Sequence, residues 1–431
     1  MSTSNEFKER TRIGLWRRAA IGSVSLAVIS VAFTTGAIPG GASTPKGGGN
    51  ISVWEWQAGT SYIPVFQNAA HRYTSQFGGK VNIESVPFAP YFTKLTSNID
   101  AGSGVPDVVE MSWTGEYQTL AKSGALLNLT KYLKTGFPAF NKAAMGSLTE
   151  NGQVYGIPMD MNTLTIAYNE GIFAKLGLKV PKSLAQLIAL AAPLRAAGDQ
   201  PLGVNEMDGW PDADLWFSQV AYTDPTHSLI FKADDGTTSW NNPQFVKAAS
   251  NVQSMVKGKL FADGSPSLTL SSVSAAFGQG QVAMMYPAGN FDTSLVNQAD
   301  NGKFKYGLFP FPPVVAGQKS LASGGPAIIW SIPAKSKNPA AALNYIRETV
   351  NAIGQAEEEA NNFIPSSASF AVPANANPIY KQMTGFQPTA QTRAIFNSSV
   401  NTALGNAMSG LLSGTVSPKQ LGVDLQAAAS K

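Results

Sequence analysis

Residues 51–86 read ISVWEWQAGTSYIPVFQNAAHRYTSQFGGKVNIESV, and their hydrophobic pattern decides the expected fold. The first four residues, Ile51 to Trp54, form an apolar run typical of a buried strand. Apolar residues then recur at spacings of three and four from Ile63 to Phe77, which predicts a helix that ends at Gly78-Gly79. Residues 81–86 alternate between apolar and polar side chains, as a half-buried strand does. The stretch therefore predicts a β-α-β unit.

The alternation of strands and helices continues along the chain. Residues 92–99 carry apolar side chains on one helical face, and residues 106–111 form the next predicted strand. A second set begins with an apolar strand from Leu164 to Tyr168. A helix is predicted to start at Ser183, and Pro193 is expected to kink it near its end. This order of elements predicts an α/β fold with mostly parallel strands.

Three later helices are marked by a capping residue followed by proline at the first helical position. The pairs are Asn242-Pro243, Asn338-Pro339 and Ser417-Pro418, and the last helix is expected to run to about Ala429. The chain has 431 residues, more than one hydrophobic core usually serves. Two domains are therefore expected.

Residues 1–45 resemble an export signal. Five basic residues between Lys8 and Arg18 precede an uncharged apolar stretch from Ala19 to Phe33. Small residues near Ala37 or Ala42 suit a cleavage site, and a Gly-rich spacer follows. An uncleaved membrane anchor is the alternative, because residues 19–37 are just long enough to cross a bilayer. Either interpretation predicts an extracytoplasmic protein.

Composition excludes several function classes. The formal charge is only +4 and the basic residues are dispersed, which argues against nucleic acid as a partner. The absence of cysteine excludes disulfides, thiolate nucleophiles and cysteine-bound metals. His71 and His227 are the only histidines, and neither has a metal-ligand partner at motif spacing. The glycines at 278 and 280 lie in a helix-to-strand turn, the reverse of a dinucleotide fingerprint, so no cofactor is expected.

Seven segments occur in an order that is more specific than any single one of them. They are Ile51–Trp56, Val105–Val109 (VPDVV), Leu120–Leu129 (LAKSGALLNL), Gly152–Asn169 (GQVYGIPMDMNTLTIAYN), Phe277–Phe291 (FGQGQVAMMYPAGNF), Tyr306–Pro310 and Gly324–Asn338 (GGPAIIWSIPAKSKN). In this order they resemble the extracellular solute-binding proteins of ABC importers, of the maltose-binding type. The resemblance extends from residue 50 to the end.

The resemblance implies a two-lobed clamshell, the type II periplasmic-binding-protein fold, with three crossovers between lobes. Crossovers are expected near residues 159–162, 306–310 and 361–365. Lobe one would then hold residues 50–160 and 309–360, and lobe two residues 163–306 and 362–431. A monomer that captures a small solute, most often a mono- or oligosaccharide, and delivers it to the permease subunits is implied. The lipid-anchor cysteine that relatives from single-membrane bacteria carry is absent.

Sugar recognition needs flat apolar faces for the ring carbons and fixed polar groups for the hydroxyls. Strand ends and the first crossover supply both types of side chain, and by similarity they line the ligand cleft. Trp54 is equally well explained as a core residue, and Glu55 and Asp160 as structural hydrogen-bond acceptors. The candidate ligand-binding residues are Trp54, Glu55, Trp56, Trp113, Asp160, Asn162, Trp210, Asn290, Phe291 and Gly324.

Two other functions remain open from the sequence. An exported glycoside hydrolase would also present aromatic side chains and a carboxylate pair, for which Glu55 with Asp160 or Glu110 would be candidates. Nothing in the sequence fixes two carboxylates at a catalytic separation, so no catalytic residue is assigned. The second alternative is a binding protein for a solute other than a sugar.

Overall fold

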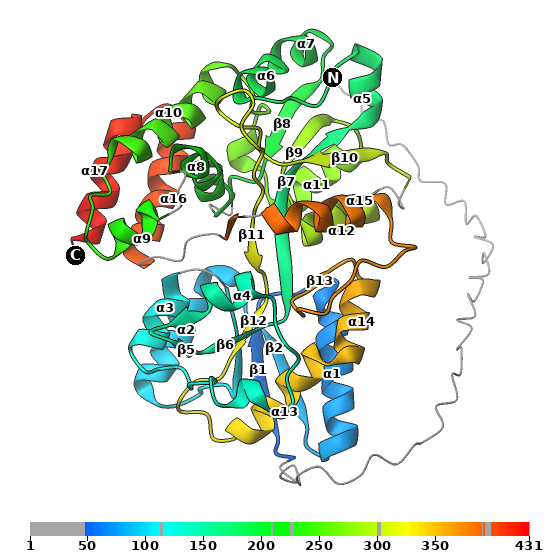
Figure 1. Cartoon of the computed structure of the whole chain (residues 1–431), viewed down its shortest axis with the longest axis vertical. Coiled ribbons are helices and arrows are strands. Elements are labelled where there is room, and N and C mark those ends of the chain that lie inside the picture. The colour runs from blue at the N-terminus through cyan, green and yellow to red at the C-terminus, as the bar shows by residue number, and fades with distance from the viewer. Residues whose placement is uncertain are drawn as a thin grey trace, which may run out of the picture. The chain divides into compact units, whose positions relative to one another are not determined.

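A computed structural model describes residues 48–112, 115–207, 210–224, 228–299, 303–389, 391–392 and 398–430. The export-signal prediction for residues 1–45 and the predicted site residue Trp113 lie outside the described residues. The chain from Lys46 onward forms one compact unit, in which helices pack around a 5-stranded and a 7-stranded sheet (Figure 1).

The first sheet has the strand order β2-β1-β3-β12-β6. β1 pairs in parallel with β2 and β3, whereas β12 runs antiparallel to β3 and β6. We call this sheet and its helices lobe one. Its strands are β1 (Ile51–Glu55), β2 (Val81–Ser85), β3 (Val108–Met111), β6 (Gly156–Pro158) and β12 (Ile329–Ser331), with a separate hairpin of β4 (Thr149–Glu150) and β5 (Gln153–Val154). Its helices are α1 (Tyr62–Phe77), α2 (Phe88–Ala101), α3 (Gly115–Lys122), α13 (Pro339–Val350) and α14 (Ala352–Ala360). The short helix α4 (Lys142–Ser147) comes from the same part of the chain but packs on strands of the second sheet.

The second sheet has the order β14-β11-β7-β9-β8, and β10 and β13 also pair with β7. We call this sheet and its helices lobe two. Its strands are β7 (Asp160–Asn169), β8 (Gln200–Val204), β9 (Val282–Ala288), β10 (Tyr306–Phe309), β11 (Ser323–Pro326), β13 (Ile364–Pro365) and β14 (Gln391–Thr392). Its helices are α5 (Glu170–Leu176), α6 (Leu184–Ala189), α7 (Ala191–Ala196), α8 (Trp210–Thr223), α9 (Leu229–Asp234), α10 (Pro243–Lys257), α11 (Leu270–Gly278), α12 (Asn290–Ala299), α15 (Pro378–Phe386), α16 (Ser398–Leu412) and α17 (Pro418–Ala429).

Within the described residues, the chain passes between the sheets three times. The first passage lies at Met159, between β6 and β7, and the third lies between α14 and β13, both where the sequence placed them. The second lies between Pro326 and Ile329, later than the predicted 306–310. The reason is that β10 and β11 both pair with β7, which keeps residues 306–326 on the second sheet. The apolar pattern of a strand does not indicate which other strand it pairs with.

Glycine and capping residues mark most helix ends as the sequence predicted. Gly78 ends α1 in the left-handed conformation (φ 79°), and the side chains of Asn242 and Ser417 cap α10 and α17 as expected. The helix predicted from Ser183 differs, since it breaks at Leu190 into α6 and α7 instead of kinking near its end. Pro193 explains the break, because its ring collides with the carbonyl four residues earlier.

Asn338 differs as well, because its side chain makes no capping hydrogen bond to α13. Its amide nitrogen donates instead to the carbonyl of Asn50, 3.2 Å away. The proline at position 339 thus marks the helix start without a side-chain cap.

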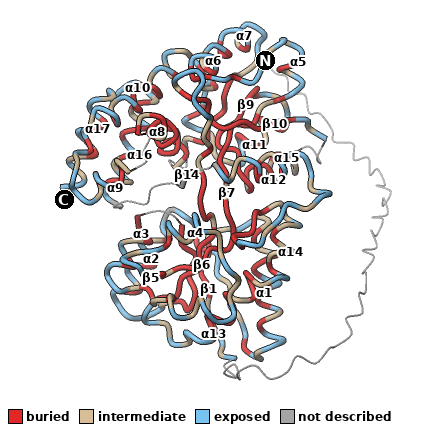
Figure 2. The backbone as a smooth tube through the Cα atoms, viewed as in Figure 1, coloured by how far each residue is buried: buried red, intermediate tan, exposed pale blue. Residues whose placement is uncertain are grey.

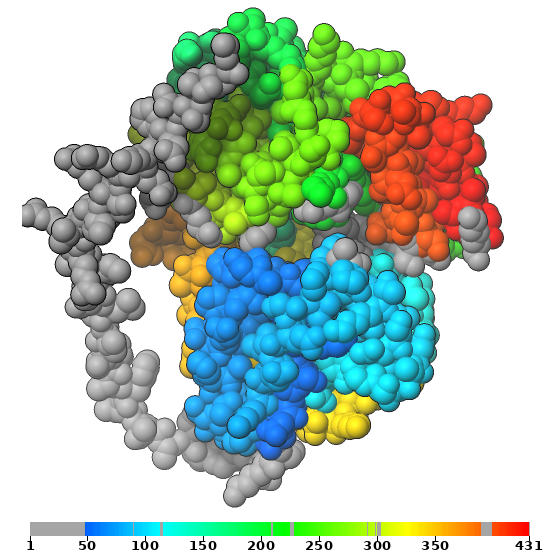
Figure 3. Space-filling model, turned by 180° about the vertical axis from the view of Figure 1, so that it is seen from behind, coloured from blue at the N-terminus to red at the C-terminus, as the bar shows by residue number. Residues whose placement is uncertain are grey.

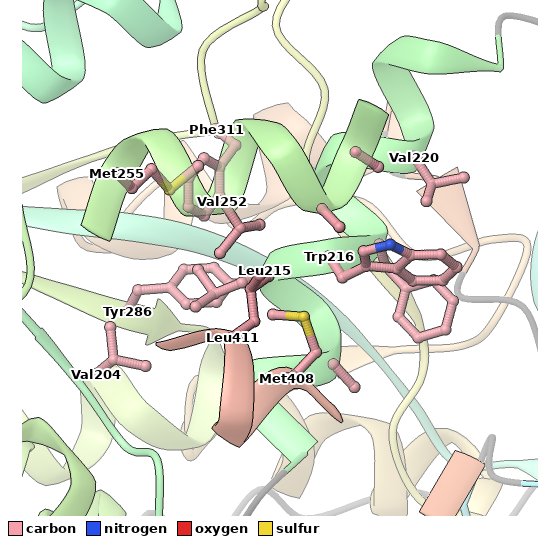
Figure 4. Close-up of a cluster of buried hydrophobic side chains, with 14 of the residues drawn as sticks. Val204, Leu215, Trp216, Val220, Val252, Met255, Tyr286, Phe311, Met408 and Leu411 are labelled. Atoms are coloured by element: carbon pink, nitrogen blue, oxygen red, sulfur yellow. The ribbon is translucent and has the colours of Figure 1, made fainter. Parts of the chain in front are cut away.

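Each lobe has its own hydrophobic core. The lobe-two core includes Leu215 and Trp216 of α8 together with Met408 and Leu411 of α16 (Figure 4). β7 is buried over most of its length (Figure 2). The C-terminal helices α16 and α17 pack beside α8 and α10 in lobe two, as Figure 3 also shows. Trp240, in the segment before α10, is also buried in this core, where its ring stacks on Phe245.

Candidate functional site

The crossovers leave each sheet at the edge where parallel strands end. In lobe one, Ile329 at the start of β12 faces Met111 at the end of β3 and Pro158 at the end of β6. In lobe two, β8 and β9 run in parallel, and Ala288 at the end of β9 pairs with Thr165 near the middle of β7. Open α/β sheets bind ligands outside the carboxyl ends of their strands. These two edges therefore define the candidate site.

Trp54 belongs to the interior of lobe one. Only 5% of its surface is exposed, and its ring meets Tyr91 edge to face with centroids 6.4 Å apart. Its indole nitrogen donates to the carboxylate of Glu84 at 2.9 Å, and the ammonium of Lys94 lies 4.2 Å above its ring. The structure thus gives Trp54 core contacts, the alternative that the sequence left open. Its role in binding stays a prediction.

Trp56 lies just beyond the end of β1 and is half-buried. Its ring contacts Phe88 and Phe92 from the first turns of α2, with centroids 5.4 and 5.7 Å away. Phe88 is 40% exposed although it is a large apolar residue. We call Trp56, Phe88 and Phe92 the aromatic platform. Sequence reasoning missed the two phenylalanines, although the Pro87-Phe88 pair directly after a strand was a usable signal.

Glu55 and Glu110 are buried at the ends of β1 and β3. The Glu110 carboxylate accepts hydrogen bonds from the Gln57 side chain at 2.6 Å and from the Trp56 backbone at 3.1 Å. Glu55 accepts from the Ser85 hydroxyl and the Gln57 backbone. Burial raises the pKa of Glu110 well above its usual range, and the Gln57 bond opposes that shift. Both carboxylates hold the loop after β1 within lobe one.

Asp160 is buried at the first crossover, where residues from several other elements bond to it. Its carboxylate accepts from the Tyr62 hydroxyl at 2.6 Å and from the Ile328 backbone at 2.9 Å. Its backbone carbonyl accepts from Ala327, and the residue pairs with Pro365 of β13. Burial raises the pKa of Asp160 to about 6, and the Tyr62 bond opposes that shift. Asp160 thus ties the three passages together.

Asn162 and Asn290 meet beside this crossover. The Asn162 side-chain oxygen accepts from the Asn290 backbone at 3.1 Å, and the Asn290 amide donates to the Met161 carbonyl at 2.6 Å. A side chain at Gly289 would approach the Asn162 oxygen to 2.4 Å, so only glycine fits there. Gly324 lies opposite Thr163 in the β7–β11 ladder. The side chain of Phe291 lies outside the described residues.

On the lobe-two edge, α8 begins at the predicted residue Trp210, which is half-buried. Two acidic residues that the sequence analysis did not single out flank it. Glu206 follows the end of β8, and Asp212 is buried in the first turn of α8. An acidic residue two positions after a tryptophan in a strand-to-helix segment was the available signal.

Other site classes find no support in the described part of the chain. No group of three or more His, Asp or Glu side chains there is placed to hold a metal ion. None of the helices described has the length and apolar character needed to cross a membrane.

The chain matches the family model of the bacterial extracellular solute-binding protein over residues 55–360. It is 26% identical over 281 residues to the multiple sugar-binding protein of Streptococcus mutans, covering 62% of this chain and 63% of that protein. It is 22% identical over 330 residues to the lactose-binding protein of Rhizobium radiobacter, covering 74% of each. A solved structure of a chitin oligosaccharide binding protein superposes with a TM-score of 0.79 at 22% identity, covering 88% of this chain and 98% of that one.

Proposed function

The chain belongs to the family of bacterial extracellular solute-binding proteins, and on that premise we propose that it captures a sugar, specifically an oligosaccharide, for an ABC importer. The observation that carries the sugar proposal is the aromatic platform at the end of β1. Sugar-binding relatives such as those of Streptococcus mutans and Rhizobium radiobacter support it.

The aromatic platform is proposed to supply the apolar ring faces that sugar rings need. Its three rings adjoin at steep angles: the Phe88 ring lies 67° from that of Trp56 and 84° from that of Phe92, and the two phenylalanine centroids are 6.2 Å apart. Aromatic side chains supply large contact areas to ligands. Three adjoining rings offer room for more than one sugar ring, which favours an oligosaccharide over a single hexose.

Polar contacts are proposed to come from the two strand edges and the crossover. Asn162, Asn290 and Trp210 carry amide and indole groups there, and the β11 backbone at Gly324 can approach a ligand closely. Glu55 and Asp160 would act by fixing the loop and the crossover, since their oxygens already accept hydrogen bonds from the protein.

Capture would proceed by closure of the two lobes about the crossovers, with no chemical step. Hinge closure shifts a conformational equilibrium through the ligand's differential affinity for the closed state. The family is one of binding proteins, not enzymes. The hydrolase alternative is disfavoured because the Glu110 carboxylate is buried and bonded to Gln57 and Trp56 of its own lobe. The partners would be the permease subunits, and the protein is proposed to work as an extracytoplasmic monomer.

A thermal-shift panel tests the function. Lactose, raffinose and oligosaccharides of arabinose, xylose and N-acetylglucosamine would be compared with spermidine and amino acids. At least one neutral sugar should raise the melting temperature, and the shift should grow with sugar concentration. Small-angle scattering at saturation should then give a smaller radius of gyration. If only spermidine or an amino acid stabilises the protein, the solute is not a sugar. If a stabilising sugar is hydrolysed, the enzyme alternative is restored.

A further inference from the structure

Two acidic residues at the lobe-two edge have no counter-charge among the described residues. Asp212 is fully buried, and neither of its carboxylate oxygens has a hydrogen-bond partner there. Glu206 is half-buried and takes part in none of the ion pairs of the described chain. Buried carboxylates in proteins are normally hydrogen-bonded or paired with a cation. A buried acid with two free acceptor oxygens therefore calls for an explanation.

The position of the pair points to the binding edge. Glu206 follows the end of β8, which runs parallel to β9, and Asn290 follows the end of β9. Asp212 lies two residues after Trp210, in the first turn of the helix that starts at this edge. The pair is therefore on the side of the second sheet from which the chain crosses to lobe one.

The described elements that pack against α8 place no buried positive charge beside Asp212 or Glu206. Those elements are α10, α16 and β11. α16 and β11 contain no ionisable side chain, and the two lysines of α10, Lys247 and Lys257, are exposed to solvent. The other ionisable residues of α8 are Asp214 and Tyr222, which bring no positive charge.

The electrostatics agree with this geometry. Burial, and to a smaller extent the neighbouring Glu206, raise the pKa of Asp212 to about 8. Burial alone raises the pKa of Glu206 to about 7. The free protein thus holds Asp212 largely protonated at neutral pH, with its acceptor capacity unused.

We propose that Asp212, assisted by Glu206, is the lobe-two subsite that accepts hydrogen bonds from adjacent hydroxyl or ammonium groups of the bound solute. The proposal rests on the proposed function, because it assumes that the solute binds at this edge. Neutral sugars and amino sugars share the donor chemistry, and the experiment separates them. The ionised carboxylate is the stronger acceptor, so binding near pH 7 releases a proton from Asp212.

The first test needs no solute. A buried carboxyl whose hydrogen-bond partners come only from a ligand lowers the stability of the ligand-free protein. It has lost its hydration, and no protein group compensates for that loss. Asp212→Asn should therefore melt at the same temperature as wild type or higher at about pH 8. Asp235→Asn is the matched control, because it removes an acid from an exposed position in the same lobe. A clear drop in the melting temperature of Asp212→Asn, without one in the control, would mean a structural role and overturn the proposal.

The second test is calorimetry with raffinose and with glucosamine trisaccharide. Asp212→Asn should weaken binding of the preferred probe by about 10- to 100-fold, and Asp235→Asn should leave it unchanged. Wild-type affinity should rise with pH up to about 8, with proton release visible as a dependence on buffer ionisation enthalpy. A preference for the amino sugar would assign an ammonium donor, and a preference for raffinose a hydroxyl donor. Equal affinity of Asp212→Asn and wild type for a bound probe would overturn the subsite while leaving sugar capture intact. If neither probe binds, the sugar proposal loses support. The melting temperature of ligand-free Asp212→Asn then decides alone for or against the subsite.

Discussion

The hydroxyl of Tyr62 donates a 2.6 Å hydrogen bond to Oδ2 of Asp160, which joins α1 of lobe one to the first residue of β7 in lobe two. The Tyr62 ring also stacks on Phe363, with centroids 3.8 Å apart and planes 4° from parallel. Phe363 lies at the third crossover, and the same Asp160 carboxylate accepts from Ile328 at the second. One tyrosine–aspartate pair therefore contacts all three connections between the lobes.

Tyr62→Phe should weaken this connection while keeping the stacked ring. We expect unfolding free energy at about pH 8 to fall by about 1.5–3 kcal/mol, the range for a hydrogen bond to a charged group. Affinity for a sugar identified in the thermal-shift panel should also change, because the bond lies at the hinge. Tyr117→Phe is the matched control, since its hydroxyl donates to the Leu148 carbonyl away from the crossovers. An affinity change of the same size in both variants would argue against a hinge role for Tyr62.

Stability should fall as pH rises above about 4, and buried acids are the reason. Burial raises the pKa of Glu358 well above its usual range, with Asp160 adding to the shift, and neither Glu358 oxygen has a hydrogen-bond partner among the described residues. A carboxyl whose folded pKa is raised stabilises the fold below its unfolded pKa and loses that contribution as pH passes the folded value. For Asp160, with a folded pKa of about 6, the loss lies between about pH 4 and 6 and amounts to about 3 kcal/mol.

Glu358→Gln tests this account, because it keeps the shape and removes the ionisation. The variant should be more stable than wild type at about pH 8 and similar at about pH 5, as measured by urea unfolding at both values. Glu359→Gln, one residue on and only half-buried, should show a smaller difference. A wild-type stability that rises between these pH values in step with the variant would refute the assignment.

The fold class was predictable from the sequence, because the spacing of apolar residues within short segments distinguishes helices from strands. The helix from residues 62 to 77 and the strands around it were readable from apolar spacing and Gly78. Strand partnership was not readable, and so the passage expected near residue 306 lies after Pro326. The same limit applies to burial, since Trp240 has a loop-like sequence context yet is buried, with its backbone donating to Gln426 of the distant helix α17.

The candidate site was predictable by position and less so by role. A strand end pointed to Trp56 and the first crossover pointed to Asp160; Trp56 follows β1 and Asp160 begins β7, while their roles in binding stay predictions. Phe88 and Asp212 were missed because their importance depends on neighbours that only the fold brings together, a second ring in one case and an uncompensated acid in the other. Trp54 and Trp56 look alike in the sequence and both rings contact Tyr91, so only their burial separates them.

A chain that begins at Thr44 should fold as stably as the full chain. The described contacts of the compact unit start at Gly49, whose carbonyl accepts from the Tyr73 hydroxyl at 2.7 Å, and at Asn50, whose carbonyl accepts from Asn338. Both survive in this truncation. A chain that begins at Val53 loses them and part of β1, so its melting temperature should fall by several degrees. Aggregation of the Thr44 chain where the full chain stays folded would show that the first residues contribute to the fold.

Truncation of the two neighbouring tryptophans should separate core from site. Trp54→Ala removes a buried ring and should reduce unfolding free energy by about 3–5 kcal/mol. Trp56→Ala should cost less stability and weaken sugar binding by about 10- to 100-fold, because it removes the centre of the aromatic platform. Phe88→Ala should weaken binding and cost less stability than Trp54→Ala, since 40% of the Phe88 surface is already exposed. Val315→Ala, an exposed apolar residue outside the platform, serves as its control. Chemical unfolding and calorimetry on the same preparations would measure both quantities, and unchanged affinity in both Trp56→Ala and Phe88→Ala would remove the platform from the site.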